Sequence, residues 1–564
     1  MKCLFIIWVL VLSLVFPNSA IASGGRNAIS TRGCANASEE TQFIAQTKQP
    51  DALIPGLGTY HHPVSTQNPQ AQKFFDQGLN LIYGFNHDEA VRSFQHAAEL
   101  DPQMAMAYWG IALALGPNIN SVVTSEKEQA AYQAIQTALE LAVQTSIPER
   151  DYIQALAKRY SPNPHADLHQ LDVDYAKAMA SLFQRYPDDL DAATLYAESL
   201  MDLHPWQLWT HDGQPQPGTN KIVAVLEYVL QRNPNHPGAN HYYIHAVEAS
   251  LHPERALESA KRLETLVPAA GHLVHMPGHI YFRVGDYAGA MRVNQQAIAQ
   301  DEPYICHNQV QGIYPQLYLT HNLHFLMVAS SMAGKHEDAL QAADKLVAHA
   351  SSIDPHLPML EGFLGNKLLM QARFGDWDEI LQTPAPDATL PTTNALWHFT
   401  RGLAYAAQNK PEDAANESRA LLAAIQIMPS EATIGFTPAS RILDIAQKFL
   451  DAKIAESKSE YNAAIAKLQQ AVVAEDNLDY VEPPDWYFPM REALGGVLLA
   501  KGDYAAAEPV FRADLKKYPH NGRSLFGLQV SLQGQGKNHA AKLAQAEFAQ
   551  VWQDSDTQLK IEKF

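Results

Sequence analysis

One short pattern, a turn followed by an alanine, recurs along most of this chain and constrains its fold more than any other feature. Its copies read FNHDEA, LHPERA, GDYAGA, GKHEDA, NKPEDA and GDYAAA, and they end at Ala90, Ala256, Ala290, Ala339, Ala414 and Ala507. Ala256 and Ala290 are 34 residues apart, as are Pro234 and Pro268. A period of this length predicts an array of repeated structural units.

Each unit reads as a helix, a turn and a second helix, with apolar residues at helical spacing. The first unit carries Phe74, Gly78 and Leu81 before the turn and Phe94, Ala97, Leu100 and Pro102 after it. The last full unit carries Leu494, Gly495, Leu498, Ala507, Phe511 and Pro519. Small residues let two helices approach closely, and proline ends the second helix because it lacks an N–H group. Strand signals are nearly absent, so we expect an all-α fold.

A 34-residue helix–turn–helix of this kind resembles the tetratricopeptide (TPR) repeat, which implies a right-handed solenoid. The resemblance covers most of residues 68–550, with irregular units near 116–130, 204–220 and 425–440. The segments YHHPVSTQNPQAQKFFDQGLNLIYGFNHDEA, HYYIHAVEAS, HLVHMPGHIYFRVGDY and HNLHF are also similar to a group of exported bacterial TPR proteins with His-rich repeats. That group supplies no settled activity. TPR arrays mostly bind partners, so the fold alone leaves the function open.

The first residues have the pattern of a secretory signal peptide. Lys2 precedes an apolar run over residues 4–16, and Ala20-Ile21-Ala22 is a small-x-small cleavage signal. The run is too short to span a bilayer. We therefore expect a signal peptide over 1–22, an N-terminal strap over 23–67, a TPR array with a His-rich concave site over 68–350 and a second TPR array over 351–564. The mature protein is expected in a bacterial periplasm, with no membrane span.

Cleavage would leave two cysteines, Cys34 and Cys306. They can pair in an oxidising compartment. However, Cys34 lies in a polar N-terminal segment, and a chain of this length can build a core without a disulfide. The sequence therefore does not require the pair.

The charge of the chain disfavours one class of partner. The sequence has 41 Lys and Arg against 60 Asp and Glu, a net charge of −19, which becomes −20 when Lys2 leaves with the signal peptide. Nucleic-acid phosphates would be repelled. A cation or a basic partner is accommodated more easily.

Seven histidines and one glutamate gather in three short segments, HYYIHAVE, HLVHMPGH and HNLH. Counted back from the alanine of their own repeat, His241, His275 and His324 lie at 15 residues, His245 and His279 at 11, and His272 and His321 at 18. Matching offsets predict side chains that lie side by side in stacked repeats, and the TPR resemblance implies that these positions line the concave groove. The first repeat carries Phe75 and Leu79 there, so the repeat itself does not demand histidine.

The spacing within each helix also suits a metal ion. His241, His245 and Glu248 form one stripe at i, i+4 and i+7. Neutral imidazoles at such spacing converge on one ion with bonds of roughly 2.0–2.1 Å. His272 and His279 are separated by a helical rise of about 10.5 Å, so one ion cannot take both. Neighbouring helices must therefore complete one or two separate sites.

Pro277 complicates the middle segment, because proline interrupts the hydrogen-bond ladder of a helix. The helix either kinks at Pro277 or begins there and leaves HLVHM as an irregular turn. The register of His272 and His275 is thus less firmly predicted than that of His241 and His245.

We predict a transition-metal site, and the expected ligands are His241, His245, Glu248, His275, His279 and His324, followed by His272 and His321. Histidine with a carboxylate and no cysteine favours Zn, Cu(II), Ni or Fe. Met276 and Met327 would suit Cu(I), but methionine at helical spacing is more often part of the core. Asn240, Asn322 and Tyr242 are candidates to orient the imidazoles, although packing explains them equally well.

Two alternatives remain open. A hydrogen-bonded histidine groove could hold a peptide or protein without a metal, or the cluster could serve a metalloenzyme. The sequence contains no GxxxxGK[ST], GxSxG, HExxH or CxxC motif and no GxGxxG followed by a strand. Nothing in it selects a reaction.

Two further segments have ambiguous roles. Tyr60-His61-His62-Pro63 is interpreted as a polar strap that caps the array, with insertion into the groove as the alternative. Residues 479–489, DYVEPPDWYFP, are interpreted as a bulky connection between repeats, with a lid or a partner-binding loop as the alternative.

Overall fold

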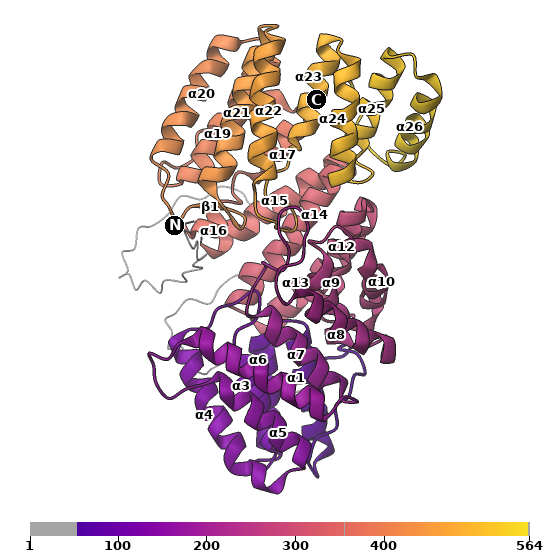
Figure 1. Ribbon diagram of the computed structural model, residues 1–564. Helices are drawn as coiled ribbons and strands as arrows, with labels where there is room; N and C mark the ends of the chain where they lie inside the picture. Colours follow the sequence, from indigo (N-terminus) through magenta and orange to yellow (C-terminus); the bar gives the residue numbers. More distant parts are fainter. Residues whose placement is uncertain (1–52, 355, 562–564) are drawn as a thin grey trace.

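The computed structural model describes residues 53–354 and 356–561, and consecutive antiparallel helices make up most of them (Figure 1). The fold is the TPR-like all-α solenoid that the repeats predict. The proposed signal peptide and Cys34 lie outside the described residues. Cys306 is disulfide-bonded, although the sequence did not require it, and the other two cysteines of the chain lie outside the described residues.

The N-terminal part of the array is drawn from indigo to magenta in Figure 1. Its helices are α1 (Pro69–Tyr83), α2 (His87–Leu100), α3 (Ala105–Leu115), α4 (Ser125–Leu141), α5 (Ile147–Leu156), α6 (Leu168–Arg185), α7 (Leu190–Met201) and α8 (Thr219–Arg232), with 3-10 turns η1 (Ala142–Gln144) and η2 (Ala157–Arg159).

The middle part carries the His-rich segments. Its elements are α9 (Pro237–Val247), η3 (Pro253–Ala256), α10 (Leu257–Leu266), α11 (Gly271–His275), α12 (Pro277–Val284), α13 (Tyr287–Asn308), the π-helical η4 (Tyr314–Leu319), α14 (Thr320–Met332) and α15 (His336–Ile353). Helix α1 packs against α9, so the first repeat lies directly beside the His-rich part.

The C-terminal part consists of α16 (Pro358–Glu361), α17 (Asn366–Phe374), α18 (Trp377–Gln382), α19 (Pro391–Ala407), α20 (Pro411–Gln426), α21 (Ala439–Ser457), α22 (Tyr461–Asp476), α23 (Met490–Lys501), α24 (Tyr504–Lys517), α25 (Gly522–Gly534) and α26 (Asn538–Val551). The short antiparallel strands β1 (Thr433–Ile434) and β2 (Thr437–Pro438) pair Thr433 with Pro438. They lie in the third of the predicted irregular units. Among the described residues, no helix is long and apolar enough to cross a membrane.

Close helix packing follows from the alternation of small and large residues. Phe94 is fully buried between two glycines, and a Cβ atom at Gly78 or Gly110 would come within 2.7 or 2.5 Å of its ring. Phe511 occupies the same setting between Gly495 and Gly527. Phe94 and Phe511 thus fill the space that glycines leave on the helices before and after them.

The helix that carries HLVHMPGH breaks at its proline, as one of the two alternatives predicted. Met276 separates α11 from α12, but its φ of −51° and ψ of −36° are helical. The chain therefore kinks without losing its register, and His275 and His279 stay on one face.

Residues 53–67 form the predicted strap along the first repeats. Val64 N donates to Gln72 Oε1 at 3.0 Å, Ser65 N donates to Glu149 Oε1 at 2.6 Å, and Gly56 O accepts from Ala269 N at 3.0 Å. These bonds attach the strap to α1, to α5 and to the segment before α11.

Candidate metal centre

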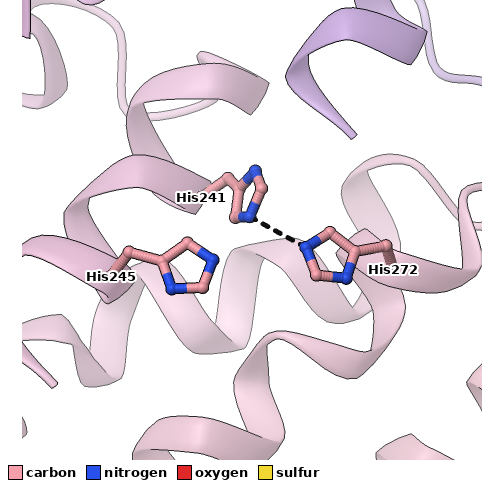
Figure 2. Close-up of side chains that lie close together, drawn as sticks. All are labelled: His241, His245 and His272. Atoms are coloured by element: carbon pink, nitrogen blue, oxygen red, sulfur yellow. Dashed lines mark hydrogen bonds between the residues drawn. The ribbon is translucent and has the colours of Figure 1, made fainter. Parts of the chain in front are cut away.

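Helix α9 presents His241 and His245 on one face, and α11 supplies His272 opposite them (Figure 2). The Nε2 atoms of His241 and His272 are 3.2 Å apart, and the Nε2 atom of His245 is buried without a hydrogen-bond partner. One nitrogen from each ring lies within 4.8 Å of the others. These residues form the first triad.

Fixed acceptors set the tautomers of the two α9 histidines. His241 Nδ1 is 2.6 Å from the carbonyl oxygen of Tyr83, which can only accept, so Nδ1 carries the proton. His245 Nδ1 donates to Glu248 Oε1 at 2.8 Å. Both rings therefore direct an unprotonated Nε2 toward the centre of the first triad, which is the arrangement that metal-binding histidines use.

A second triad lies one repeat further along and consists of His275, His279 and His321. The Nε2 atoms of His275 and His279 are 2.7 Å apart, and those of His279 and His321 are 3.4 Å apart. Again, one nitrogen from each residue lies within 4.8 Å of the others.

Asn294 orients His275 in this second triad. Its Nδ2 donates to Ala290 O at 2.8 Å, so its Oδ1 faces His275 Nδ1 and accepts a hydrogen bond of 2.8 Å. The absence of a side chain at Gly278 makes this contact available, because a Cβ there would lie 2.8 Å from Asn294 Nδ2.

Glu248 joins the two triads. Its Oε1 accepts from His245 Nδ1, and its Oε2 accepts a short hydrogen bond from His279 Nδ1. Both oxygens thus face the Nδ1 side of ligand-type histidines rather than the centre of either triad. Glu248 was predicted as a ligand, and it lies close enough to His245 and His279 for the three to hold an ion. In the hydrogen bonds that the structure shows, it orients one histidine of each triad. Burial alone would raise the pKa of Glu248, but His279 and His245 outweigh it and lower the pKa.

The two triads are adjacent and buried. The rings of His245 and His279 have centroids 5.5 Å apart, and those of His272 and His275 are 5.7 Å apart. His321 is half-buried, and the other five histidines are at most 6% exposed. Burial lowers the pKa of His241, His272, His275 and His321 well below the usual value, and neighbouring histidines lower it further. These imidazoles are neutral at neutral pH, which keeps their lone pairs available.

The prediction that the three segments converge is confirmed, but the grouping differs from the one that matching offsets predict. Each triad takes its histidines at offsets 15 and 11 from one repeat and its histidine at offset 18 from the next repeat. His272 and His279 enter different triads, as their helical separation requires. Two centres therefore straddle two repeat boundaries.

His324 was predicted among the likeliest ligands, but it lies outside both triads. Its Nε2 is 2.8 Å from Tyr487 Oη, and its ring packs against Phe363. It sits one helical turn beyond His321 on α14, which turns it toward the C-terminal part of the array. Burial lowers its pKa to about 3.

The residues considered as supports have ordinary structural roles. Met276 and Met327 are fully buried in the core. Asn240 Nδ2 donates to Pro234 O, and Asn322 Nδ2 donates to Asp301 Oδ2. Tyr242 is buried among aromatic rings that include Phe85.

The partners that do orient the imidazoles, the Tyr83 carbonyl and Asn294, were missed by sequence reasoning. A backbone carbonyl leaves no signature in a sequence. Asn294 lies 15 residues after His279, on a different helix, and carries no motif.

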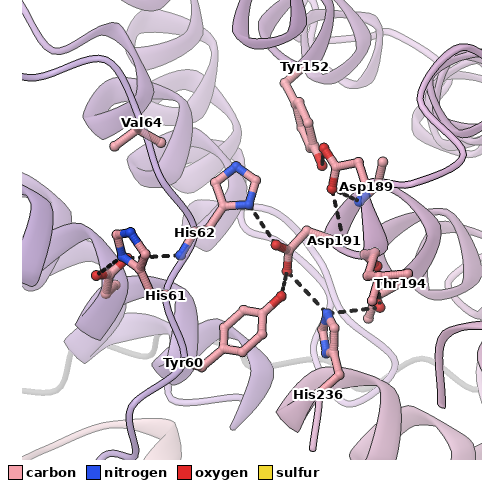
Figure 3. Close-up of polar contacts among 12 residues, drawn as sticks. Tyr60, His61, His62, Val64, Tyr152, Asp189, Asp191, Thr194 and His236 are labelled. Carbon is pink, nitrogen blue, oxygen red and sulfur yellow. Dashed lines mark hydrogen bonds and ion pairs between the residues drawn. The ribbon is translucent and has the colours of Figure 1, made fainter. Parts of the chain in front are cut away.

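A second polar cluster surrounds Asp191 on α7 (Figure 3). Its Oδ2 accepts from His62 Nδ1 at 2.6 Å, and its Oδ1 accepts from Tyr60 Oη at 2.8 Å, from Tyr83 Oη and from His236 Nε2 at 3.2 Å. Burial lowers the pKa of His62, but the charge of Asp191 outweighs this and raises it to about 9.

His62, Asp189 and Asp191 lie close enough to hold an ion, but all four carboxylate oxygens already accept hydrogen bonds. We therefore interpret the cluster as an ionic contact that fixes the strap, as predicted for Tyr60 and His62. The cluster is also connected to the first triad through Tyr83. The Tyr83 hydroxyl donates to Asp191, and the Tyr83 carbonyl oxygen accepts a hydrogen bond from His241 Nδ1.

A small cleft reaches the first triad from outside. It is lined by His245, Glu248 and the mostly apolar residues Ile119, Met201, Trp206, Leu208, Trp209, Ala249 and Tyr480. Tyr480 comes from the 479–489 segment, whose Tyr487 contacts His324. That segment connects α22 to α23, as interpreted, and it also covers the His-rich face, which corresponds to the lid alternative.

No family model and no curated protein match this chain. Among solved structures, the Cut9–Hcn1 hetero-tetramer of the APC/C aligns with a TM-score of 0.30 and 15% identity over 82% of this chain and 76% of that one. Human IFIT1, solved as a dimer with m7Gppp-AAAA, aligns with a TM-score of 0.30 and 12% identity over 87% of this chain and 92% of that one. A TM-score this low does not identify a structural relative, so the fold assignment rests on the helical hairpins described above.

Proposed function

We propose that this protein binds two transition-metal ions, one in each histidine triad. The observation that carries the proposal is the pair His275 and His279. Both donate Nδ1–H to fixed acceptors, so their unprotonated Nε2 atoms face each other at 2.7 Å. Two lone pairs at that distance repel unless a shared proton or a metal cation lies beside both. His241 and His245 have fixed Nδ1 acceptors as well, and the Nε2 atom of His272 approaches that of His241 at 3.2 Å.

The donor sets define the class of ion. Three imidazole nitrogens per ion suit Zn, Cu, Ni or Fe, and they leave a coordination position open on each ion. Glu248 and Asn294 would hold the rings in place, which typically contributes about 10–100-fold to metal affinity. The predicted signal peptide supports placement of this metal protein in the periplasm.

The peptide-binding alternative is less well supported at this site. The five most buried histidines are at most 6% exposed, so a peptide would reach them only after the 479–489 segment moved away. A protein partner of the TPR-like scaffold would use another surface.

Elemental analysis tests the proposal directly. The mature chain, purified without a His tag or chelator and then reloaded, should bind two ions. His272→Gln should remove one ion and His321→Gln the other, because each variant cuts one triad to two ligands. His324→Gln is the matched control, since it replaces a buried histidine outside both triads and should leave both ions bound.

Two results would contradict the proposal. One is a wild-type chain that takes up no metal from Zn, Cu, Ni and Fe. The other is a chain in which the His324 variant loses as much metal as the triad variants.

A further inference from the structure

We infer that the paired centre holds copper(I) and that its substrate is dioxygen, which arrives through the cleft between Trp206 and Tyr480. This inference rests on the metal site proposed above. It adds the charge state of the ions, the substrate and the route of entry.

Charge balance favours monovalent ions. The six triad histidines are neutral ligands, and Glu248 is the one carboxylate that hydrogen-bonds to them. Beyond it, Glu482 accepts a hydrogen bond from Tyr480, and the guanidinium of Arg283 lies over the Tyr480 ring. Two divalent ions against Glu248 would leave three uncompensated positive charges in a buried site, whereas two monovalent ions leave one. Burying uncompensated charge is costly, so the site favours the lower charge.

The coordination number points to the same ion. Each triad offers three nitrogens, and the carboxylate of Glu248 lies outside both sets, in a separate group with His245 and His279. Copper is the first-row metal that has a stable monovalent state and accepts imidazole ligands. As a d10 ion, copper(I) is also stable with three donors. A reduced copper pair satisfies both the charge and the ligand count of the buried centre.

The cleft selects a small and neutral substrate. Its volume is about 20 Å³, and a water molecule needs roughly 10–15 Å³, so the cleft holds about one small molecule. Trp209 Nε1 donates to Ala246 O at 2.8 Å, and Tyr480 Oη donates to Glu482 Oε2 at 2.6 Å. With these polar groups already engaged and apolar side chains around them, the walls favour an apolar diatomic molecule over an ion.

The cleft also leads to the first triad. Trp206, 43% exposed, forms its outer wall, and its ring lies 5.3 Å from the ring of His245 in an edge-to-face contact. His245 belongs to the first triad and shares Glu248 with the second. A molecule that passes Trp206 therefore arrives beside His245 of the first triad and beside Glu248, which joins the two triads.

The two ions match the electron demand of dioxygen. A copper(I) pair held by the triads would supply two electrons, one from each ion as it becomes copper(II), and dioxygen with two protons from two water molecules would leave as hydrogen peroxide. The two hydroxide ions that remain from the water would stay with the two copper(II) ions, so the net charge of the buried centre would be the same before and after the reaction. An external reductant is needed only to begin another turnover.

The test uses the full chain loaded with two copper(I) ions under anaerobic conditions, with copper content measured first. Addition of dioxygen should consume one O2 and release one H2O2 per copper pair, and the copper should become oxidised. Failure to load copper in a chain that binds Zn, Ni or Fe would overturn this inference and leave the metal proposal standing, whereas uptake of none of the four metals would refute the metal proposal. Full loading of two copper(I) ions without oxygen uptake would overturn this inference and leave the metal proposal standing.

A filled cleft tests the route. Ala249→Phe should leave two copper ions bound and slow the reaction with dioxygen by about tenfold or more, because entry would then require a conformational change. Ala466→Phe, on the exposed face of α22, is the matched control and should react at the wild-type rate. Trp206→Ala should react at least as fast as the wild type. Unchanged rates in the copper-loaded Ala249 variant would exclude this cleft as the entry path.

Discussion

At the scale of single residues, the acceptors around Nδ1 distinguish four of the triad histidines from His324. Glu248, Asn294 and the Tyr83 carbonyl accept the Nδ1 protons of His241, His245, His275 and His279 and leave Nε2 unprotonated. His324 is equally buried, but its Nε2 faces Tyr487 and its Nδ1 has no partner. His272 also has an Nδ1 without a partner, but its Nε2 faces His241 inside the first triad. The difference lies in the neighbours of each ring rather than in its exposure.

His324 gives the metal-free protein a specific sensitivity to acid. Its folded pKa of about 3 is lower than the unfolded value of about 6.5, so the unfolded chain binds more protons and stability falls as the pH drops below about 6.5. At pH 4.5 the loss from this residue is about 2–3 kcal/mol. Urea unfolding at pH 7 and 4.5 should therefore show a smaller pH effect for His324→Gln than for the wild type. Equal pH effects would mean that His324 is not held neutral in the fold.

At the scale of the helices, packing repeats what the sequence repeats. The spacing of Gly78, Phe94 and Gly110 matches that of Gly495, Phe511 and Gly527, and both sets make the same contact. Such local contacts are what a repeat pattern encodes, which is why the fold class and the irregular connections were predictable.

Overpacking one of these contacts should destabilise the array. In Gly495→Val the new Cβ would lie 2.4 Å from Phe511 Cζ, so the ring or a helix must shift. We expect a loss of about 1–3 kcal/mol in urea or thermal unfolding. Ala505→Val, at an exposed position of α24, is the control and should change stability by no more than about 0.5 kcal/mol. Equal effects of the two substitutions would argue against this account of the packing.

The candidate site was predictable in its residue types but not in its grouping. The sequence separation between the second and third histidine is 27 residues in the first triad and 42 in the second, because α13 and η4 lengthen the second interval. Equal offsets therefore selected the six triad histidines together with His324, which lies outside the triads, whereas the pairing across repeat boundaries depends on how the helices stack. Tyr480 lies far along the chain from His245, and no local pattern could place it there.

At the scale of the whole molecule, two segments outside the repeats bind distant parts together. The strap fixes the first repeats through Asp191, and the 479–489 segment joins the C-terminal part to the His-rich part. Both segments contact the neighbourhood of the first triad, through Tyr83 and Tyr480 respectively.

Asp191→Asn should release the strap. The substitution removes the negative charge that His62 and His236 face, and loss of one member of a buried pair typically costs about 3–5 kcal/mol. Hydrogen exchange should then rise over residues 53–67, whereas the rest of α7 stays protected. Thr59→Ala, at an exposed strap position, is the control and should leave this exchange unchanged. A protected strap in the Asp191 variant would show that other contacts suffice to hold it.

The grouping of the histidines across repeat boundaries has a consequence for a repeat protein that is lengthened by duplication of its units. Because each centre borrows two donors from one unit and one from the next, a single unit excised alone would carry an incomplete set, and each added unit would complete one more. Each tandem duplication of a unit would thus add one candidate centre along the superhelix together with one repeat of the scaffold. The number of centres would be one less than the number of contributing units, as three units and two triads already illustrate.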